Sequence, residues 1–218
     1  MKVSYYSLGC KVNLYESEAI VNEFIENGFE LTNFDDICDI YIINTCTVTK
    51  ASDAKSRKII RQAIKKNPNA VICVMGCYSQ LHPDEVKQIE GVDVIVGTSN
   101  RIMLYPLAMS ALEKKNPQVL IQDALKTKNY EELKIKRFNN KTRGFIKIED
   151  GCNNFCTYCA IPYARGPVRS RNHQDVIDEI KLLTEQGTKE IVLTGINTAA
   201  YGSDLKDYTF AKLLEDIV

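Results

Sequence analysis

The sequence predicts an α/β protein in which a doubly wound parallel sheet is followed by the first part of a (β/α) barrel. Short apolar runs that suit strands alternate along the chain with longer segments of helical periodicity. The run 40–44 is almost continuously apolar, which is typical of a strand covered by helices on both faces. Alternation of this kind implies right-handed crossovers between parallel strands.

The first half of the chain contains four predicted strand–helix pairs. We expect the first helix to begin at Asn13, an N-cap residue with Glu16 three positions further on, and to end at Gly28. Pro83 is placed to open a later helix. The predicted strands are 2–7, 40–44, 70–75 and 92–96, and the predicted helices are 13–28, about 52–66, one that starts at 83, and 101–113.

A charged stretch without clean periodicity, residues 122–143, separates the two halves and is interpreted as a linker. A second series follows, with strands at 144–148 and 190–194 and helices at about 174–186 and from 207 onward. The predicted parts are therefore an α/β domain at 1–121, the linker at 122–143, and the start of a barrel at 144–218. Because two strand–helix units cannot close a barrel, we expect the chain to be truncated on its C-terminal side.

The bulk composition argues against several classes of protein. The chain has 218 residues, of which 44% are hydrophobic, and a formal net charge of zero, so no global field indicates a nucleic-acid or membrane partner. We find no signal peptide and no apolar stretch long enough to span a membrane. Eight cysteines without a secretion signal favour a reducing compartment. We therefore expect a cytoplasmic monomer with no membrane partner.

Three cysteines lie close together after the strand predicted at 144–148. Cys152, Cys156 and Cys159, here called the loop triad, have three and then two intervening residues in a loop rich in Gly and Asn. Thiolates suit iron–sulfur clusters, and three ligands on a four-iron cluster leave one iron open for a substrate or cosubstrate. The spacing alone is also compatible with zinc. Ferredoxin cysteines are spaced differently, so simple electron transfer fits less well.

Three further cysteines follow predicted strands of the first half. Cys10, Cys46 and Cys77, here called the edge triad, each come two or three residues after a strand. Parallel strands end at the same edge of a sheet, where ligand sites gather, so these cysteines can converge in space. Placement alone leaves a metal site and simple burial equally open. Cys38 and Cys73 lack this placement and are interpreted as small buried apolar residues.

Both triads resemble those of one family. The loop triad resembles the cluster loop of radical S-adenosylmethionine (SAM) enzymes. The edge triad lies in segments SLGCKVN, NTCTVT and GCY, which resemble the three cysteine segments of the methylthiotransferases. Order, spacing and neighbours match over residues 1 to about 202. The segments GCKVNLYE and IPYARGPVRSR are similar to the branch that acts on threonylcarbamoyl-adenosine in tRNA.

The resemblance implies two 4Fe–4S clusters and SAM as cofactors. The loop triad would hold the cluster that passes one electron, supplied by an external reductant, to SAM. The edge triad would hold an auxiliary cluster whose open iron carries the sulfur. The radical formed from SAM would remove hydrogen from carbon 2 of the adenine, a step that acid–base residues cannot perform, and a methylthio group would take its place.

The resemblance also implies SAM-binding residues. Tyr158 occupies the aromatic position that lies beside the adenine of SAM in radical enzymes, although plain packing is the other interpretation. Thr194, Gly195 and Asn197 end the second barrel strand, where the family binds the methionine part of SAM. The glycine could equally serve only a tight turn.

Basic residues suggest a surface for the tRNA partner. Arg165, Arg169 and Arg171 would contact phosphates, together with Arg137, Lys141, Arg143 and Lys147 and with the basic helix at 52–66. For each charge run a solvated face is the other interpretation. His82 and His173 lie in no motif and are assigned no role.

Other functions remain open at this point. Within the family, the substrate could be isopentenyl-adenosine in tRNA or an aspartate of a ribosomal protein. A non-catalytic metal scaffold would bind metal without cleaving SAM. A cobalamin-dependent radical enzyme is set aside, because neither histidine lies in an Asp-x-His-x-x-Gly motif. Family members continue through the rest of the barrel into an RNA-binding domain, so the predicted activity is that of the parent protein.

Overall fold

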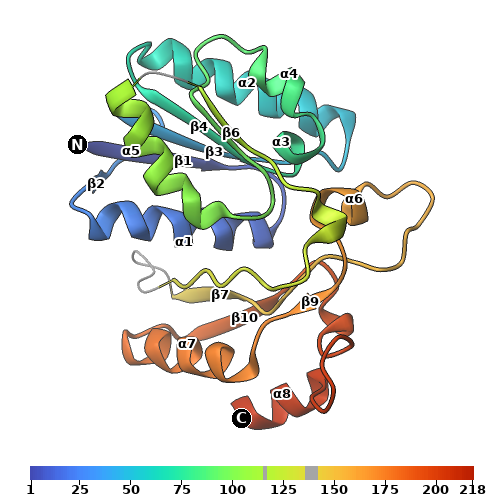
Figure 1. Cartoon of the computed structure of the whole chain (residues 1–218). Helices are drawn as coiled ribbons and strands as arrows, with labels where there is room; N and C mark the ends of the chain where they lie inside the picture. Colours follow the sequence, from blue (N-terminus) through green and yellow to red (C-terminus); the bar gives the residue numbers. More distant parts are fainter. Residues whose placement is uncertain (115–116, 136–141) are drawn as a thin grey trace.

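The computed structural model describes residues 1–114, 117–135 and 142–218. Figure 1 shows its layers from top to bottom. A helical layer with α2 (Lys50–Lys66) lies above a large sheet, and α1 (Lys11–Glu26) lies below that sheet. A small second sheet follows, and α7 (His173–Glu185) and α8 (Phe210–Ile217) form the lowest layer. The first helix therefore lies between the two sheets.

The large sheet has six parallel strands in the order β2-β1-β3-β4-β5-β6. They are β1 (Lys2–Ser7), β2 (Glu30–Leu31), β3 (Ile40–Thr45), β4 (Val71–Gly76), β5 (Val94–Val96) and β6 (Gln118–Leu120). All four strands predicted in this half are present. The two edge strands β2 and β6 were not predicted, because runs of two and three residues carry no readable alternation.

Helices cover both faces of this sheet, which confirms the doubly wound fold. One face packs against α1 and against α5 (Leu104–Lys114), which the short 3₁₀ helix η1 (Arg101–Met103) precedes. The other face packs against α2, with α3 (Cys77–Leu81) and α4 (Pro83–Lys87) nearby. In β3, Ile40 and Ile42 join the first apolar core, whereas Tyr41 and Ile43 join the second. Cys38 and Cys73 are buried, as predicted.

The start of α1 differs from the prediction. Its N-cap residue is Cys10, which makes no side-chain cap, and both Asn13 and Glu16 lie inside the helix. Both side chains are buried and bond to distant segments: Asn13 to the ends of β1 and β3, and Glu16 to positive charges of the second half. The capping-box prediction is therefore wrong, because these polar groups face other parts of the protein and not their own helix terminus.

The second half is smaller. Strands β7 (Arg143–Lys147) and β10 (Glu190–Thr194) pair in parallel, and β8 (Glu149–Asp150) pairs antiparallel with β9 (Arg169–Ser170). The other elements are α6 (Ile161–Arg165), η2 (Ala124–Lys126) and η3 (Thr198–Ala200). The strands and helices predicted here are confirmed within a few residues, whereas the two-residue strands β8 and β9 were not predicted.

The predicted linker packs against the rest of the protein over its described part. Leu133 and Ile135 are buried in the same core as α1 and β7, and Figure 1 shows the segment running alongside β7. Residues 136–141 of this linker, including Arg137 and Lys141, lie outside the described residues. Among the helices that the structure describes, none has the length and apolar character needed to cross a bilayer.

Candidate functional site

The edge triad lies at the carboxyl ends of three neighbouring strands. β3 pairs with β1 on one side and β4 on the other, and Thr45 is in register with Gly76. Cys46 and Cys77 therefore follow at the same level of the sheet. The chain goes from β1 outward to β2 and then returns to β3 on the other side. The triad thus occupies the point at which the strand order reverses, where ligand sites form in open sheets.

Two glycines bring the cysteine-bearing turns close to the end of β3. Gly9 has a φ of +95°, and a Cβ there would lie 3.0 Å from the Sγ atom of Cys46. Gly76 has a φ of +103°, and a Cβ there would lie 2.3 Å from Oδ1 of Asn44. Left-handed backbone and lack of space both require glycine at these positions. The turns that carry Cys10 and Cys77 are thereby held against β3.

Asn13 fixes the ends of β1 and β3 relative to each other. Its Nδ2 atom donates to the carbonyl groups of Leu8 and Thr45, at 2.8 and 3.0 Å. Its Oδ1 atom accepts from Nη2 of Arg165 at 2.6 Å, and the thiol of Cys10 lies 3.8 Å from the same oxygen. The residue expected to cap a helix instead organises the edge triad.

The three thiols of this triad differ in exposure. Cys10 is exposed, whereas Cys46 and Cys77 are buried. Burial raises the pKa of the Cys77 thiol, and Glu16 and Cys10 act in the same direction, while the positive charge and hydrogen bond of Arg165 oppose them. Cys10 therefore lies close enough to Cys77 to act on it electrostatically.

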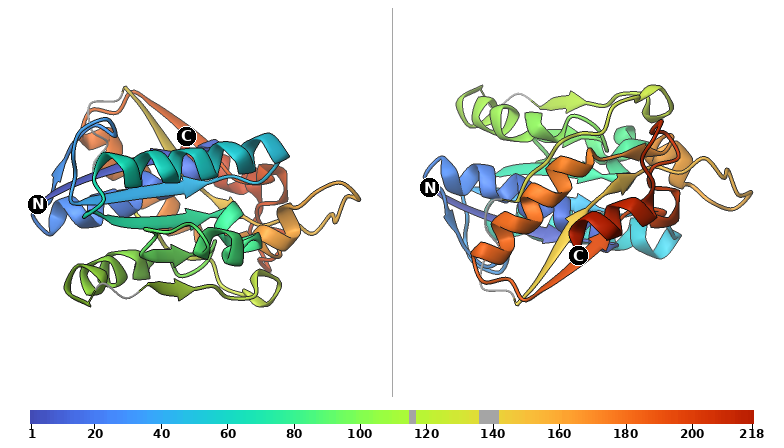
Figure 2. Two further views of the ribbon diagram at one scale, coloured as in Figure 1. Left: turned by 90° about the horizontal axis from the view of Figure 1, so that it is seen from above. Right: turned by 90° about the horizontal axis from the view of Figure 1, so that it is seen from below.

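The loop triad lies on a projecting loop that is closed at its base. Both views in Figure 2 show this loop, in orange, extending beyond the rest of the protein. Gly151 has a φ of +87°, and a Cβ there would lie 2.0 Å from the carbonyl oxygen of Pro167. The backbone N–H of Cys152 donates to the carbonyl of Gly166 at 3.0 Å. Cys156 is exposed and the other two cysteines are half-buried, so all three thiols are accessible to a cluster.

Tyr158 has an exposed fraction of 90%. The packing role that the sequence left open for it is therefore absent from this structure. In the same loop, the ring of Phe155 packs edge-on against Tyr163 with 5.7 Å between centroids, and its backbone has a φ of +46°. Tyr158 is the aromatic side chain of this loop that remains free to cover a bound molecule.

The turn after β10 lies beside the base of the same loop. Thr194 ends β10, in register with Lys147 of β7. A Cβ at Gly195 would lie 2.8 Å from Oε2 of Glu149, and that oxygen accepts from the backbone N–H of Asn197 at 2.8 Å. The structure therefore brings Thr194, Gly195 and Asn197 next to the loop triad's strand.

Glu149 is a site residue that the sequence analysis missed. Its side chain is buried, and its Oε1 atom has no hydrogen-bond partner among the described residues. Burial raises the pKa of Glu149 to about 7, and the neighbouring charge of Asp150 adds to this effect, while the backbone of Asn197 opposes it. The sequence signal that could have indicated it is the pair of adjacent carboxylates, Glu149 and Asp150, directly before the cysteine loop.

A buried cluster of charges joins the two halves. We call it the central ion cluster. Its members are Glu16, Arg101, Lys147, Asp150 and Arg165. Lys147 lies 2.8 Å from Glu16 and 2.7 Å from Asp150, and Arg165 lies 2.9 Å from each of the same two carboxylates. Burial alone would raise the pKa of Glu16, but its three cationic neighbours lower it to about 2. The same cations hold the pKa of Asp150 well below its ordinary value against the effect of burial.

The three arginines predicted to contact tRNA lie inside the protein. Arg165, Arg169 and Arg171 have exposed fractions of 1%, 4% and 0%. Arg165 and Arg169 pair with Asp150, and Arg171 pairs with Glu132 and Glu179. The prediction of a phosphate-binding surface from these residues is therefore wrong, because their charges are neutralised by buried carboxylates.

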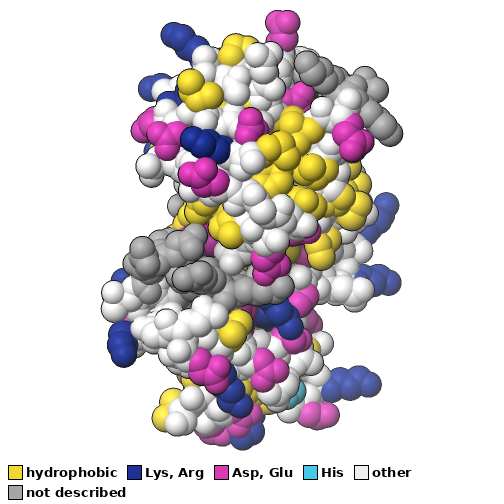
Figure 3. Space-filling model, turned by 90° about the vertical axis from the view of Figure 1, so that its left-hand side faces the viewer, with side chains coloured by type: hydrophobic (Ala, Val, Ile, Leu, Met, Phe, Trp, Pro, Cys, Tyr) yellow, Lys and Arg dark blue, Asp and Glu magenta, His cyan; other side chains and the backbone are white. Residues whose placement is uncertain are grey.

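Other basic residues do face solvent. In α2, Lys55, Lys58, Arg61 and Lys65 are exposed, whereas Arg57 is paired with Glu85 and Lys66 with Asp35. Figure 3 shows a different face of the protein, on which Lys and Arg are interspersed with Asp and Glu. His82 contacts Glu85, and His173 stacks on Tyr208, so both histidines have local structural partners.

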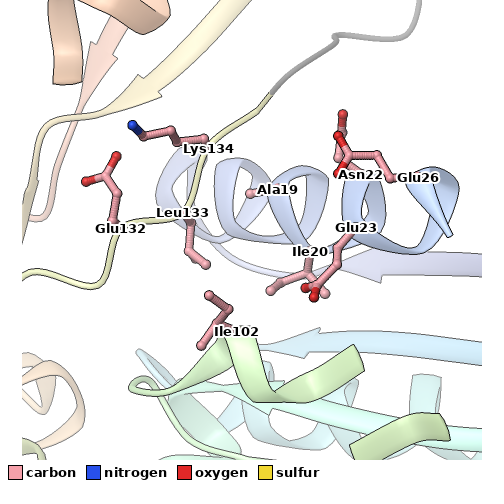
Figure 4. A pocket seen from close by; sticks show the side chains of 9 residues that line it. All are labelled: Ala19, Ile20, Asn22, Glu23, Glu26, Ile102, Glu132, Leu133 and Lys134. Atoms are coloured by element: carbon pink, nitrogen blue, oxygen red, sulfur yellow. The ribbon is translucent and has the colours of Figure 1, made fainter. Parts of the chain in front are cut away.

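A shallow concavity lies between α1, η1 and the segment 132–134, as Figure 4 shows. Ala19, Ile20 and Leu133 contribute apolar side chains to it, and Glu23, Glu26 and Glu132 contribute carboxylates. None of the predicted site residues lines it. We therefore place the candidate chemistry at the two triads and not in this concavity.

The two triads fit iron–sulfur clusters by donor type and by placement. Each supplies three free thiols from one edge or one loop, and thiolates are the ligands that such clusters prefer. Within the described ranges, no group of three or more His, Cys, Asp and Glu side chains is arranged to hold a single metal ion. A cubane cluster places its protein ligands on different irons, so its thiolates do not converge on one point.

Comparison with known proteins agrees with this arrangement. Residues 2–97 match the family described as uncharacterized protein family UPF0004, and residues 146–217 match the radical SAM superfamily. The chain is 49% identical, over 99% of its length, to the threonylcarbamoyladenosine tRNA methylthiotransferase MtaB of Bacillus subtilis. It is 37% identical, over 96% of its length, to a tRNA-2-methylthio-N(6)-dimethylallyladenosine synthase of Clostridium botulinum. It covers 48% of each of these relatives, and so spans about half their length.

A solved structure shares the fold. The radical SAM methyltransferase TsrM from Kitasatospora setae, with cobalamin and a [4Fe-4S] cluster bound, aligns with a TM-score of 0.63. The alignment covers 99% of this chain and 50% of that one, at 13% identity. At this identity the likeness concerns the fold alone.

The matched domains and the two triads define a radical SAM protein with an N-terminal UPF0004 domain. More specifically, the chain is similar over nearly its whole length to methylthiotransferases, the family that the cysteine segments resemble.

Proposed function

We propose that the parent protein of this chain is a tRNA methylthiotransferase that adds a methylthio group to carbon 2 of N6-threonylcarbamoyladenosine. Its cofactors would be SAM and two 4Fe–4S clusters, one on each triad. It would act in the cytoplasm as a monomer that receives electrons from an external one-electron reductant. The observation that carries the proposal is the presence of two separate thiol triads, one at an edge of the large sheet and one on the projecting loop after β8 (Figure 2).

The chain's own residues have distinct tasks in this proposal. The loop triad would hold the cluster that binds SAM, and the turn of Thr194, Gly195 and Asn197, which lies beside the base of its loop, would bind the methionine part of SAM. Tyr158 would cover the adenine of SAM, since its side chain is exposed and unused in packing. When bound, the clusters and SAM supply the electron, the carbon-centred radical and the sulfur that acid–base residues cannot provide.

Substrate binding is proposed for the exposed basic residues of α2. Lys55, Lys58 and Arg61 face solvent and are available to phosphates, unlike the three buried arginines. Such contacts would position tRNA without reading its sequence. Support for the threonylcarbamoyl substrate comes from the names of relatives 49% and 38% identical to this chain, compared with 37% for the dimethylallyl-specific relative.

Iron counting after anaerobic reconstitution tests the two-cluster proposal. We expect about eight irons per chain in the wild type, and about four when either triad is replaced by alanines, as for independent cubanes. If the wild type binds only about four irons and the loop-triad variant binds the same number, this chain builds only the auxiliary cluster. One or two zinc ions with no iron would contradict the proposal and favour a metal scaffold.

Nucleoside analysis tests the substrate. The full-length protein would be expressed in a host that lacks its own tRNA methylthiotransferases, and digested tRNA would be examined by mass spectrometry. We expect methylthiolated threonylcarbamoyladenosine, and its loss in the loop-triad alanine variant. Methylthiolation of dimethylallyladenosine instead would identify the other tRNA branch, and unmodified tRNA would contradict a tRNA substrate.

A further inference from the structure

Arg165 reaches from the loop-triad half into the edge-triad half. It is the last residue of α6 and lies six positions after Cys159. Its guanidinium group is fully enclosed, with an exposed fraction of 1% for the residue. Nη1 lies 2.9 Å from Glu16 in α1 and 2.9 Å from Asp150 in β8, and Nη2 donates to Oδ1 of Asn13 at 2.6 Å.

These contacts place one cation against the ligand framework of the edge triad. Asn13 Oδ1, which accepts from Arg165, also lies 3.8 Å from the thiol of Cys10. Asn13 Nδ2 holds the carbonyl of Thr45, the residue directly before Cys46. The positive charge of Arg165 also acts on the thiol of Cys77, and α3, which begins at Cys77, packs against α6. Arg165 is therefore connected to all three cysteines of the triad.

We propose that Arg165 is a positioning residue of the auxiliary cluster site, which orients Cys10 through Asn13 and places its positive charge close to Cys77. It thereby fixes one triad relative to the other and raises the reduction potential of a cluster on the edge triad. This inference rests on the proposed function, because it requires a cluster at that triad. The physical reason is that a positive charge close to the ligating sulfurs stabilises the reduced, more negative state of a cluster.

Arg171 provides a matched control. It is equally buried and also joins the two halves, but its described partners are Glu132, Glu179 and the hydroxyl of Tyr15. A substitution at Arg171 therefore disturbs a buried ion pair between the halves without removing a contact to a cysteine. A general effect of loosening the structure would appear in both variants.

The test uses the chain with the loop triad replaced by alanines, so that only the auxiliary cluster can form. After anaerobic reconstitution, its reduction is followed by electron paramagnetic resonance during titration with dithionite. We expect Arg165→Gln to lower the equilibrium constant for one-electron reduction about tenfold, which corresponds to about 59 mV. Arg171→Gln is expected to keep the potential of the background protein.

The possible outcomes separate this inference from the proposed function. No iron in the background protein would overturn both. If the background protein binds iron and Arg165→Gln has the same reduction potential, only the role of Arg165 would be overturned. The same holds if Arg171→Gln shifts the reduction potential as much as Arg165→Gln does.

If Arg165→Gln does not fold, Arg165→Lys is used in its place, because it keeps the charge but loses the planar fork. We then expect a smaller shift in the same direction, and an unchanged potential would overturn the inference.

Discussion

The hydroxyl group of Tyr15 in α1 lies 3.1 Å from a carboxylate oxygen of Glu179 in α7, 164 residues further along the chain. The same hydroxyl donates to the carbonyl of Leu133, in the segment that connects the two halves. Arg171 completes this group by pairing with Glu179 and Glu132. Together with the central ion cluster, this contact means that the two halves are joined by two sets of buried polar interactions on one helix.

Tyr15→Phe should destabilise the protein by about 1–3 kcal/mol, because the buried carbonyl of Leu133 loses its donor and Glu179 loses one of its polar contacts. Urea unfolding of the metal-free protein measures this. Tyr208→Phe is the control, since Tyr208 bonds to Asp216 at the surface, and it should change stability by less than about 0.5 kcal/mol. Equal effects of the two substitutions would contradict the importance of the buried contact.

Glu16→Gln should cost about 3–5 kcal/mol, because Arg101, Lys147 and Arg165 would keep their charges in a buried site with one counter-ion fewer. Glu85→Gln removes an exposed ion pair with Arg57 and should cost less than about 1 kcal/mol. Thermal unfolding at neutral pH compares the two. A loss in Glu16→Gln no larger than in the control would mean that the central ion cluster contributes little to stability.

The same residue predicts a response to acid. The folded-state pKa of Glu16 is lowered from 4.5 to about 2, so its ionised form stabilises the fold above its ordinary pKa, and this contribution is lost as the pH falls toward 2. The wild type should therefore lose more stability than Glu16→Gln between pH 5 and 2, expressed as the difference in unfolding free energy. Parallel curves for the two proteins would contradict this.

Gly76→Ala should be much more damaging than Gly28→Ala. Both glycines have positive φ, but a Cβ at Gly28 would meet no atom within 4 Å, whereas one at Gly76 would lie 2.6 Å from the carbonyl oxygen of Thr45. Gly28→Ala should cost about 1–2 kcal/mol from backbone strain alone. Gly76→Ala adds overpacking, for a total of about 3 kcal/mol or more, and should reduce iron bound by the edge triad. Similar unfolding midpoints and iron contents in the two variants would show that the end of β3 can shift to make room for the added methyl group.

Glu149→Gln should change the pH dependence of stability near neutrality. Because burial raises the folded-state pKa from 4.5 to about 7, the folded protein holds a proton that the unfolded chain has released between these values. Stability should therefore fall as the pH rises from 4.5 to 7, by about 3 kcal/mol from this group, and then level off. The variant should lack this component in urea titrations. If Glu149→Gln lost as much stability as the wild type over this pH range, the effect would come from another titrating group.

The large sheet was predictable because its central strands are apolar runs with clear boundaries, and the placement of the edge triad at one edge of that sheet followed from the rule that parallel strands end together. The partners of Asn13, Glu16 and Arg165 were not predictable. They come together from positions 149 and 152 residues apart, and the local pattern of Asn13 and Glu16 equally suits a helix cap. The basic composition near Arg171 likewise carries no information on whether a buried carboxylate neutralises each charge.

The central ion cluster also sets a rule for combining parts of related proteins. Glu16 and Arg101 come from the first half of the chain, whereas Lys147, Asp150 and Arg165 come from the second, and the ion pairs of Glu16 with Lys147 and Arg165 cross between the halves. A hybrid that joins the first half of one relative to the second half of another inherits one set from each parent. Such hybrids should assemble only where the inherited residues at these five positions still form opposite charges across the junction.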